Sequence, residues 1–164
     1  DVDAALRDAE AVLKGDGNYT FTFANDWQTA SKAAFQLASG PLVSNEQFSA
    51  GGATSVRGYL AAERTGDDGY LLSEELRTPS LAKFLGSYVQ EWRFYAFAEG
   101  AQLYLRDELP DQEADYSLAS VGLGTRASLS KWLSGSLDWG YPLLEGPNTS
   151  KQESRLHFNL QATF

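Results

Sequence analysis

The sequence of 164 residues contains no cysteine and no methionine. Without cysteine, disulfides, thiolate nucleophiles and zinc–thiolate sites are excluded. The missing initiator methionine predicts that the chain is a mature or excised segment. Basic residues are also scarce, with 13 Lys and Arg against 22 Asp and Glu and a formal net charge of -9. Because phosphate binding requires a basic face, we expect no nucleic-acid partner.

Long apolar runs are missing as well. No segment approaches the ~20 consecutive apolar residues that a membrane-spanning helix needs, and no signal peptide is present. These absences exclude a helical membrane protein. They do not exclude a membrane β-barrel, whose strands carry a much weaker hydropathy signal. Aromatic residues, at 13% of the chain, and the 15 glycines mildly favour a barrel.

Residues 1–17 are predicted to be a loop or a short helix. Apolar side chains recur there at roughly helical spacing, and Gly15 and Gly17 would end a helix. In a barrel the same segment could equally be a loop. Residues 18–164 are predicted to form the barrel strands.

From Tyr19 onward, apolar and polar side chains alternate with period two. The final stretch, residues 155–164, alternates without a break, which is typical of a strand with one apolar and one wet face. No helical pattern separates the stretches, so the sequence predicts an all-β antiparallel meander of about seven strands. The predicted strands are residues 19–27, 32–38, 69–77, 91–105, 116–129, 132–141 and 155–164.

Two architectures fit this alternation, a soluble sandwich or small soluble barrel and a transmembrane β-barrel. The strands run toward the roughly 9–11 residues that cross a bilayer, and aromatic residues lie near strand ends, as in interfacial girdles. Both features favour the membrane barrel, with its apolar face toward lipid. Glu74 alone falls on the apolar face, and we expect it near the rim or turned by a bulge. The girdle candidates are Tyr19, Trp27, Trp92, Trp132 and Tyr141.

A glycine-rich loop, residues 44–68, interrupts the strand pattern. Gly51, Gly52 and Gly58 permit positive φ angles and close approach to other parts of the chain. Between Val56 and the Gly58-Tyr59 pair stands Arg57, whose guanidinium offers a fixed fork of donors suited to a carboxylate. The loop is therefore predicted to fold tightly around or into something.

Five motifs together resemble one family. They are Ser44-Asn45-Glu46-Gln47-Phe48, Gly51-Gly52, Ser55-Val56-Arg57-Gly58-Tyr59, Gly66-Asp67-Asp68-Gly69 and Glu75-Leu76-Arg77-Thr78-Pro79. In this order and spacing they are similar to the C-terminal barrel of two-partner secretion transporters of the haemolysin-activator type. That family lies within the superfamily of outer-membrane assembly and translocation barrels. The resemblance runs from about residue 19 to the terminus.

The resemblance implies secretion of a partner protein through a β-barrel pore in the bacterial outer membrane, surrounded by lipid. It also implies that the Arg-Gly loop is an extracellular loop folded back into the lumen, where its arginine meets an acidic residue of a Phe-x-Asp-x-Gly motif. The matching stretch here is Phe97-Ala98-Glu99-Gly100, which has glutamate in place of aspartate and a different spacing to the glycine. We therefore pair Arg57 with Glu99, as a latch of the loop or as a purely structural salt bridge.

The last strand resembles the signal that barrel-insertion machinery recognises. Its apolar face carries Phe158, Leu160 and, at the end of the sequence, Phe164. The family's barrel has roughly sixteen strands preceded by periplasmic POTRA domains, and neither fits in this chain. The sequence is thus predicted to be the C-terminal part of a larger barrel, although closure of these strands or pairing between chains remains possible.

Catalytic and metal sites have little support in the sequence. His157 is the only histidine and is predicted to line the lumen, and no serine-hydrolase arrangement is present. We expect no enzyme activity, cofactor or metal. The acidic stretches, which include Asp67-Asp68, lack the spacing of a calcium loop and are expected to be solvated. Two alternatives to secretion remain: an assembly factor of the same superfamily that inserts barrels, and a soluble β-rich binding module.

Overall fold

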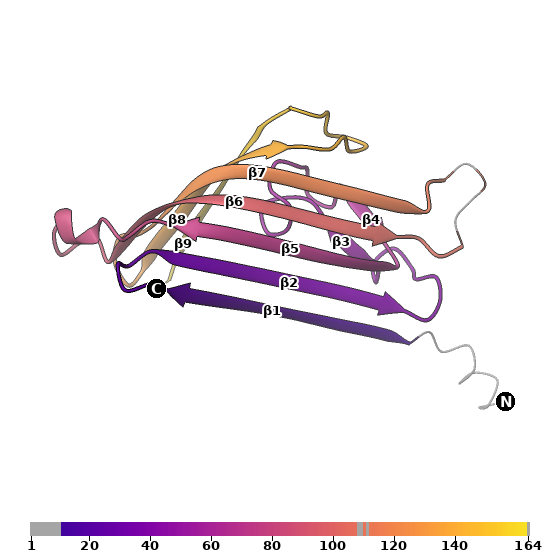
Figure 1. Ribbon diagram of the computed structural model, residues 1–164, viewed down its shortest axis with the longest axis horizontal. Helices are drawn as coiled ribbons and strands as arrows, with labels where there is room; N and C mark the ends of the chain where they lie inside the picture. Colours follow the sequence, from indigo (N-terminus) through magenta and orange to yellow (C-terminus); the bar gives the residue numbers. More distant parts are fainter. Residues whose placement is uncertain (1–10, 108–109, 111, 164) are drawn as a thin grey trace.

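Seven strands form one antiparallel meander in the computed structural model, which describes residues 11–163 except 108, 109 and 111 (Figure 1). Each strand pairs with its neighbours in the order β1-β2-β5-β6-β7-β8-β9, and β1 and β9 are the two edges of a sheet that does not close within the described residues. The predicted all-β antiparallel meander is thus confirmed. The strands are β1 (Val12–Thr22), β2 (Gln28–Ala38), β5 (Asp68–Arg77), β6 (Glu91–Tyr104), β7 (Asp115–Ser128), β8 (Leu133–Pro142) and β9 (Arg155–Ala162).

A long connection between β2 and β5 lies on one side of the sheet. This connection, residues 39–67, is called the inner loop below, and its two ends pair as the short strands β3 (Phe48–Ala50) and β4 (Arg64–Gly66). The sheet curls, so that β8 and β9 pass behind β5 and β6 in Figure 1. The 3-10 turn η1 (Ala82–Phe84) lies in the connection between β5 and β6. Across the described residues, no helix is long and apolar enough to span a membrane.

The first strand begins earlier than the sequence predicts. Residues 12–17 belong to β1 and are extended, because the ladder with β2 is unbroken from Val12↔Ala38 to Thr22↔Gln28. Pairing across the sheet therefore overrides the helical spacing. Gly15 does not end a helix but makes room for a ring, since a Cβ there would lie 2.5 Å from Phe35 Cε1. Residues 1–10, the remainder of the predicted loop or helix, lie outside the described part.

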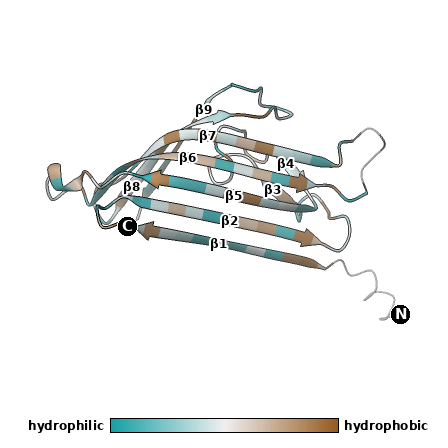
Figure 2. Cartoon of the chain, in the orientation of Figure 1, coloured by the Kyte–Doolittle hydropathy of each residue, from teal (hydrophilic) through white to brown (hydrophobic). Residues whose placement is uncertain are grey.

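The two faces of the sheet differ in polarity, as the alternating colours along each strand in Figure 2 show. The outer face exposes large apolar side chains, including Leu72 at 54%, Leu123 at 58% and Phe158 at 79% exposure. The inner face buries carboxylates, with Glu75 at 8% and Glu99 at 7%. A soluble protein has the opposite distribution, whereas a barrel wall facing lipid outside and a polar interior has this one.

Glu74 lies on the outer face, and the expectation that a bulge turns it is wrong, while its position near the rim stays a prediction. The pairing of β5 with β6 runs without a bulge from Asp68↔Tyr104 to Arg77↔Tyr95, and Glu74 is the seventh of ten residues in its strand. Its carboxylate accepts a hydrogen bond from Ser31 Oγ at 2.7 Å. The strand thus keeps its regular alternation at this residue.

The aromatic residues predicted to form girdles occupy strand ends, with one exception. Trp27 and Trp132 directly precede β2 and β8, Trp92 is the second residue of β6, and Tyr141 is the next-to-last residue of β8. Tyr19 lies further inside its strand because β1 starts at Val12 rather than near Tyr19. Indole and phenol rings favour the boundary between an apolar and a wet region, so these positions suit a bilayer interface.

The apolar core lies between the inner loop and the sheet. Val56 and Tyr59 of the loop are completely buried against Leu103 of β6 and Leu118 of β7. These wall residues occupy the half of the inner face near the start of β5, and the buried carboxylates Glu75 and Glu99 lie in the other half. The loop therefore rests on an apolar patch while its tip extends over the polar half.

Candidate functional site

The inner loop reaches the wall because glycines shape its tip. Gly51, Gly52 and Gly58 have φ angles of 111°, 96° and 97°, a region that side chains with a Cβ rarely adopt. Gly58 also packs directly on the wall strand β8, where a Cβ on Gly140 would lie 2.4 Å from Gly58 N and 2.7 Å from the Arg57 carbonyl carbon. The backbones of the loop and of β8 thus touch with no side chain between them. This contact fixes how closely the Arg57 side chain approaches the wall.

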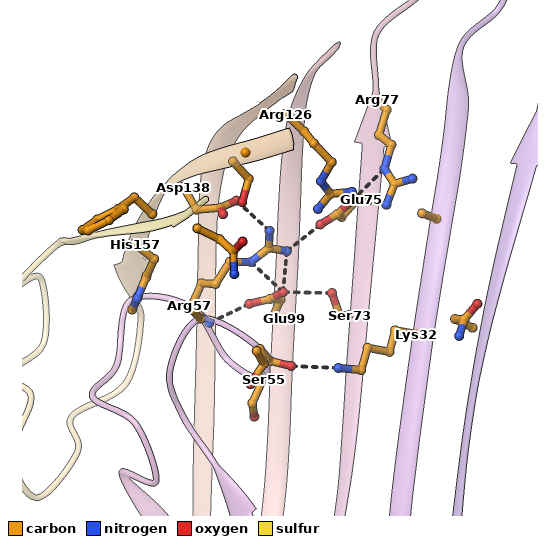
Figure 3. Close-up of a pocket in the computed structure, with 18 of the residues that line it drawn as sticks. Lys32, Ser55, Arg57, Ser73, Glu75, Arg77, Glu99, Arg126, Asp138 and His157 are labelled. Carbon is orange, nitrogen blue, oxygen red and sulfur yellow. Dashed lines mark hydrogen bonds and ion pairs between the residues drawn. The ribbon is translucent and has the colours of Figure 1, made fainter. Parts of the chain in front are cut away.

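Three carboxylates from three strands surround the Arg57 guanidinium (Figure 3). Nε and Nη2 donate to Glu99 Oε1 at 2.9 and 2.5 Å, and Nη1 donates to Asp138 Oδ1 at 2.8 Å. Nη2 also lies 2.9 Å from Glu75 Oε1. The backbone N–H of Arg57 donates to the second oxygen of Glu99 at 2.6 Å. All four side chains are less than 10% exposed, so these are buried, charge-assisted hydrogen bonds.

Aromatic rings complete the site. The guanidinium carbon lies 3.6 Å from the centroid of the Phe97 ring and 5.8 Å from that of Tyr95. Two glycines of β7 make space for these rings, because a Cβ on Gly122 would collide with Phe97 and one on Gly124 would collide with Tyr95. A guanidinium flat against an aromatic face gains cation–π attraction in addition to its hydrogen bonds.

The electrostatic balance keeps Arg57 charged. Burial by itself would lower the pKa of the guanidinium, but the hydrogen bond and charge of Glu99, with the charges of Glu75 and Asp138, raise the pKa above its ordinary value. The loop therefore carries a permanent cation into the wall at every pH at which a protein is folded.

A second set of contacts holds the loop to the connection between β8 and β9. Glu63 is 4% exposed and accepts hydrogen bonds from Asn148 N at 2.7 Å and Thr149 Oγ1 at 2.9 Å. The Tyr59 hydroxyl lies 2.8 Å from the carbonyl oxygen of Leu144 in the same connection. Burial raises the pKa of Tyr59, and hydrogen bonds to backbone carbonyls only partly offset this effect. The loop is thus held at two points, at Arg57 against the wall strands and at Tyr59 and Glu63 against the connection between β8 and β9.

His157 lies on the inner face, where the sequence predicts it. Its Nε2 accepts a hydrogen bond from Gly58 N at 3.0 Å. A nitrogen that accepts carries no proton, so this contact requires Nε2 to be unprotonated. His157 therefore helps to position the loop backbone beside Arg57.

The two aspartates where the inner loop meets β5 are buried, so the expectation from sequence that they are solvated is wrong. Asp67 is 1% exposed and accepts hydrogen bonds from Leu42 N, Gln47 Nε2 and Arg106 N at 2.8, 3.0 and 2.7 Å. Asp68 is 9% exposed and accepts from Ala38 N at 2.6 Å. These carboxylates join the ends of neighbouring segments. No group of side chains suited to a metal ion occurs among the residues that the structure describes.

The residues singled out from the sequence fall into three places. Val56, Arg57, Tyr59, Phe97 and Glu99 come together at the wall. Gly100 lies on the outer face, one residue beyond Glu99, and takes no part in the site. The remaining residues lie elsewhere: Gly51, Gly52 and Gly58 shape the loop, Phe158 and Leu160 are exposed on the outer face of β9, and Phe164 lies outside the described residues. A role for β9 as an assembly signal stays a prediction.

Sequence reasoning missed Glu75, Asp138, Tyr95 and Glu63. Strand alternation places Glu75 and Asp138 on the polar face but gives no distance between strands. One signal in the sequence could have pointed to Asp138: it lies two residues from Gly140 and so on the same face of the strand. A glycine inside a strand often marks a site where another backbone or a ligand approaches closely.

Comparison with known proteins gives two matches. The family described as haemolysin secretion/activation protein ShlB/FhaC/HecB matches residues 9–127. Among solved structures, CdiB from Acinetobacter baumannii is similar, with a TM-score of 0.67 and 21% identity over 94% of this chain and 27% of that one. The chain thus spans little more than a quarter of that structure, whose likeness shows the fold. No significant match was found among curated proteins.

Proposed function

The chain belongs to the ShlB/FhaC/HecB family of haemolysin secretion/activation proteins, and on this premise we propose that it forms part of the wall of a pore through which a partner protein is secreted. Its location is the outer membrane of Gram-negative bacteria, where this family resides. The inner loop is the plug or latch of this pore, and Arg57 holds it closed on Glu99, Glu75 and Asp138.

The distribution of side chains supports a pore. The outer face suits lipid, and the inner face beyond the loop is lined by polar side chains that offer hydrogen bonds without a deep apolar pocket. No nucleotide-binding motif occurs in the sequence. Passage of the partner protein would thus be driven by its own unfolding and refolding.

One observation supports the latch most directly: the buried guanidinium of Arg57, on the inner loop, pairs with carboxylates from three wall strands. An intact buried ion pair contributes little net stability, but removal of one partner is strongly unfavourable, by roughly 3–5 kcal/mol. Such a contact is sensitive to the position of the loop, as a latch must be.

The first prediction concerns Arg57→Ala in the full-length protein. We expect this variant to insert into the outer membrane as a folded barrel and to lose secretion of the partner protein, because three buried carboxylates are left without their cation. Secretion is measured as partner protein in the culture medium, and folding is measured as heat-modifiable migration on a gel.

The matched control is Arg64→Ala, which removes an arginine from the same loop. Arg64 lies 3.6 Å from the largely exposed Glu113 and over the Tyr116 ring, 3.8 Å from its centroid, and has no ion pair with the three carboxylates, so we expect this variant to keep secretion. Normal secretion by Arg57→Ala would refute the latch. Intact secretion combined with a fall in other outer-membrane barrels would instead favour the assembly factor.

A further inference from the structure

The three carboxylates around Arg57 are held by the wall itself. Arg77 donates to Glu75 Oε2 at 2.8 and 2.6 Å, and Ser73 Oγ donates to Glu99 Oε1 at 2.9 Å. The Tyr95 hydroxyl donates to Asp138 Oδ1 at 2.7 Å. Each carboxylate therefore has a donor that does not belong to the loop. These donors keep each carboxylate oriented when the loop leaves. The site formed by Glu75, Glu99, Asp138 and the Phe97 ring, called the seat of Arg57 below, is therefore preformed on rigid strands.

The charge of the seat is balanced only while a guanidinium fills it. Glu75, Glu99 and Asp138 bring three negative charges, and Arg57, Arg77 and the nearby Arg126 bring three positive ones. Withdrawal of the loop removes one positive charge and leaves these side chains with a net charge of -1. Three carboxylates that converge without their cation attract a positive charge.

The shape of the seat selects a guanidinium over an ammonium ion. The carboxylate oxygens receive hydrogen bonds from Nε, Nη1 and Nη2, which lie in one plane, while the Phe97 ring covers the face of that plane at 3.6 Å. An ammonium is a compact point charge that can satisfy neither the planar fork nor the flat contact with the ring.

The seat borders a hollow of about 560 Å³ on the inner face, which Figure 3 shows in close-up. The Arg57 tip and its carboxylates form one side of this hollow, and Lys32, Arg126, Ser134 and Gln161 are among the residues that line the rest. A polypeptide running through the hollow would pass within side-chain reach of the seat.

We propose that the seat of Arg57 is a preformed guanidinium receptor that, when the inner loop withdraws, binds arginine side chains of the polypeptide crossing the barrel. This proposal rests on the proposed secretion function, because that function identifies the crossing polypeptide as the secreted partner protein. The bound arginine replaces Arg57, restores the charge balance, and keeps the loop from re-engaging until the segment has moved on. The loop is thereby an internal competitor of its own substrate.

The test uses the full-length Arg57→Ala protein in planar lipid bilayers, with methylguanidinium and methylammonium as probes. We expect methylguanidinium to alter the channel current at a concentration about tenfold lower than methylammonium does, a ratio set by the cation–π and fork contacts. A short peptide with one arginine should act likewise, while the same peptide with neutral citrulline should not. Wild-type protein with its loop engaged should respond to neither cation.

The double variant R57A/E99Q provides the matched loss of the receptor and should abolish the response. If Arg57→Ala fails to insert, Arg57→Val serves in its place, since it removes the charge and carries no donor that could occupy the carboxylates. Equal sensitivity to both cations, or an unchanged response in R57A/E99Q, would overturn the receptor. If a response appeared only after Arg126 was also replaced by alanine, Arg126 would be the guanidinium that fills the seat in Arg57→Ala, which supports the receptor; no response in that double variant would overturn it.

These outcomes are separable from those of the secretion experiment. If Arg57→Ala secretes normally yet binds methylguanidinium, the latch fails and the receptor stands. If secretion is lost and no cation preference is found, the latch stands and the receptor fails.

Discussion

Two adjacent glutamates have opposite environments because strand alternation sends them to opposite faces. Glu75 is 8% exposed and is paired with Arg57 and Arg77. Glu74 faces outward among apolar side chains and accepts a hydrogen bond from the hydroxyl of Ser31. The same functional group therefore contributes to a buried ion network at one position and lies on the apolar outer face at the next.

The contrast gives a prediction for Glu74→Gln. A charge facing lipid is destabilising near mid-depth, less for carboxylates than for the roughly 2–4 kcal/mol of basic residues. The glutamine keeps an acceptor for Ser31, so we expect the free energy of unfolding to rise by about 1–2 kcal/mol. Denaturant titration of the full-length protein in lipid vesicles, followed by tryptophan fluorescence, measures this change.

The adjacent substitution Glu75→Gln is the control, with the opposite sign expected. It leaves both Arg57 and Arg77 with less compensation, so stability should fall. A fall in stability on Glu74→Gln would mean that the outer face at this position contacts protein and not lipid.

At the scale of elements, the loop and the wall meet through glycine. The tip rests on β8 at Gly140, and the rings that line the seat fit into spaces left by Gly122 and Gly124 of β7. Glycine weakens a strand in isolation because it offers no side chain to pack. Here its absence of a Cβ lets a second layer of backbone and rings lie against the strand.

Gly140→Ala should therefore push the tip off the wall. The new Cβ would lie 2.4 Å from Gly58 N, and the loop would have to retreat by roughly 1 Å to reach an ordinary contact distance. Overpacking of this kind costs about 1–3 kcal/mol, which we expect to appear as more frequent opening of the channel in planar bilayers.

A strand glycine with free space is the control for this effect. A Cβ on Gly100 would meet only the Leu118 carbonyl oxygen, at 3.6 Å, so Gly100→Ala should leave channel opening unchanged. If the two variants opened equally often, close contact at Gly140 would not be what seats the loop.

At the scale of the whole molecule, Asp67 joins segments that are far apart in the sequence. It holds the start of the inner loop at Leu42 and Gln47 to Arg106 in the connection after β6. Burial would raise the pKa of Asp67, but the hydrogen bonds from Arg106 N, Leu42 N and Gln47 outweigh burial and lower the pKa below its ordinary value of 3.8. The carboxylate form is thus the one that the fold stabilises.

The sign of this shift predicts how stability depends on pH. Because the pKa is lower in the folded protein, the contribution of Asp67 is present above about pH 4 and is lost as the pH falls through the folded pKa. We expect Asp67→Asn to lower the melting temperature at pH 7 and to reduce the difference in melting temperature between pH 7 and pH 3. An unchanged pH dependence in this variant would exclude Asp67 as a contributor.

Much of the fold could be predicted from the sequence because period-two alternation is a local property. Six of the seven strands lie within a few residues of their predicted ranges, and the face to which Glu99, Tyr95 and His157 point follows from counting by twos. The failure at β1 has a physical reason, since residues 12–17 carry a weak helical spacing that the ladder with β2 overrides. Local preference is decisive only where no stronger pairing competes with it.

The sequence by itself determined six of the seven strands, their two faces, and the presence of an arginine on a glycine-rich loop. Only the tertiary structure decided which carboxylates receive that arginine. Glu75, Glu99 and Asp138 are separated by 24 and 39 residues, from 75 to 99 and from 99 to 138, and come together because the sheet curls around the loop tip. Distances between strands depend on sheet curvature and on the space that Gly122, Gly124 and Gly140 leave open, and no local pattern along one strand encodes them.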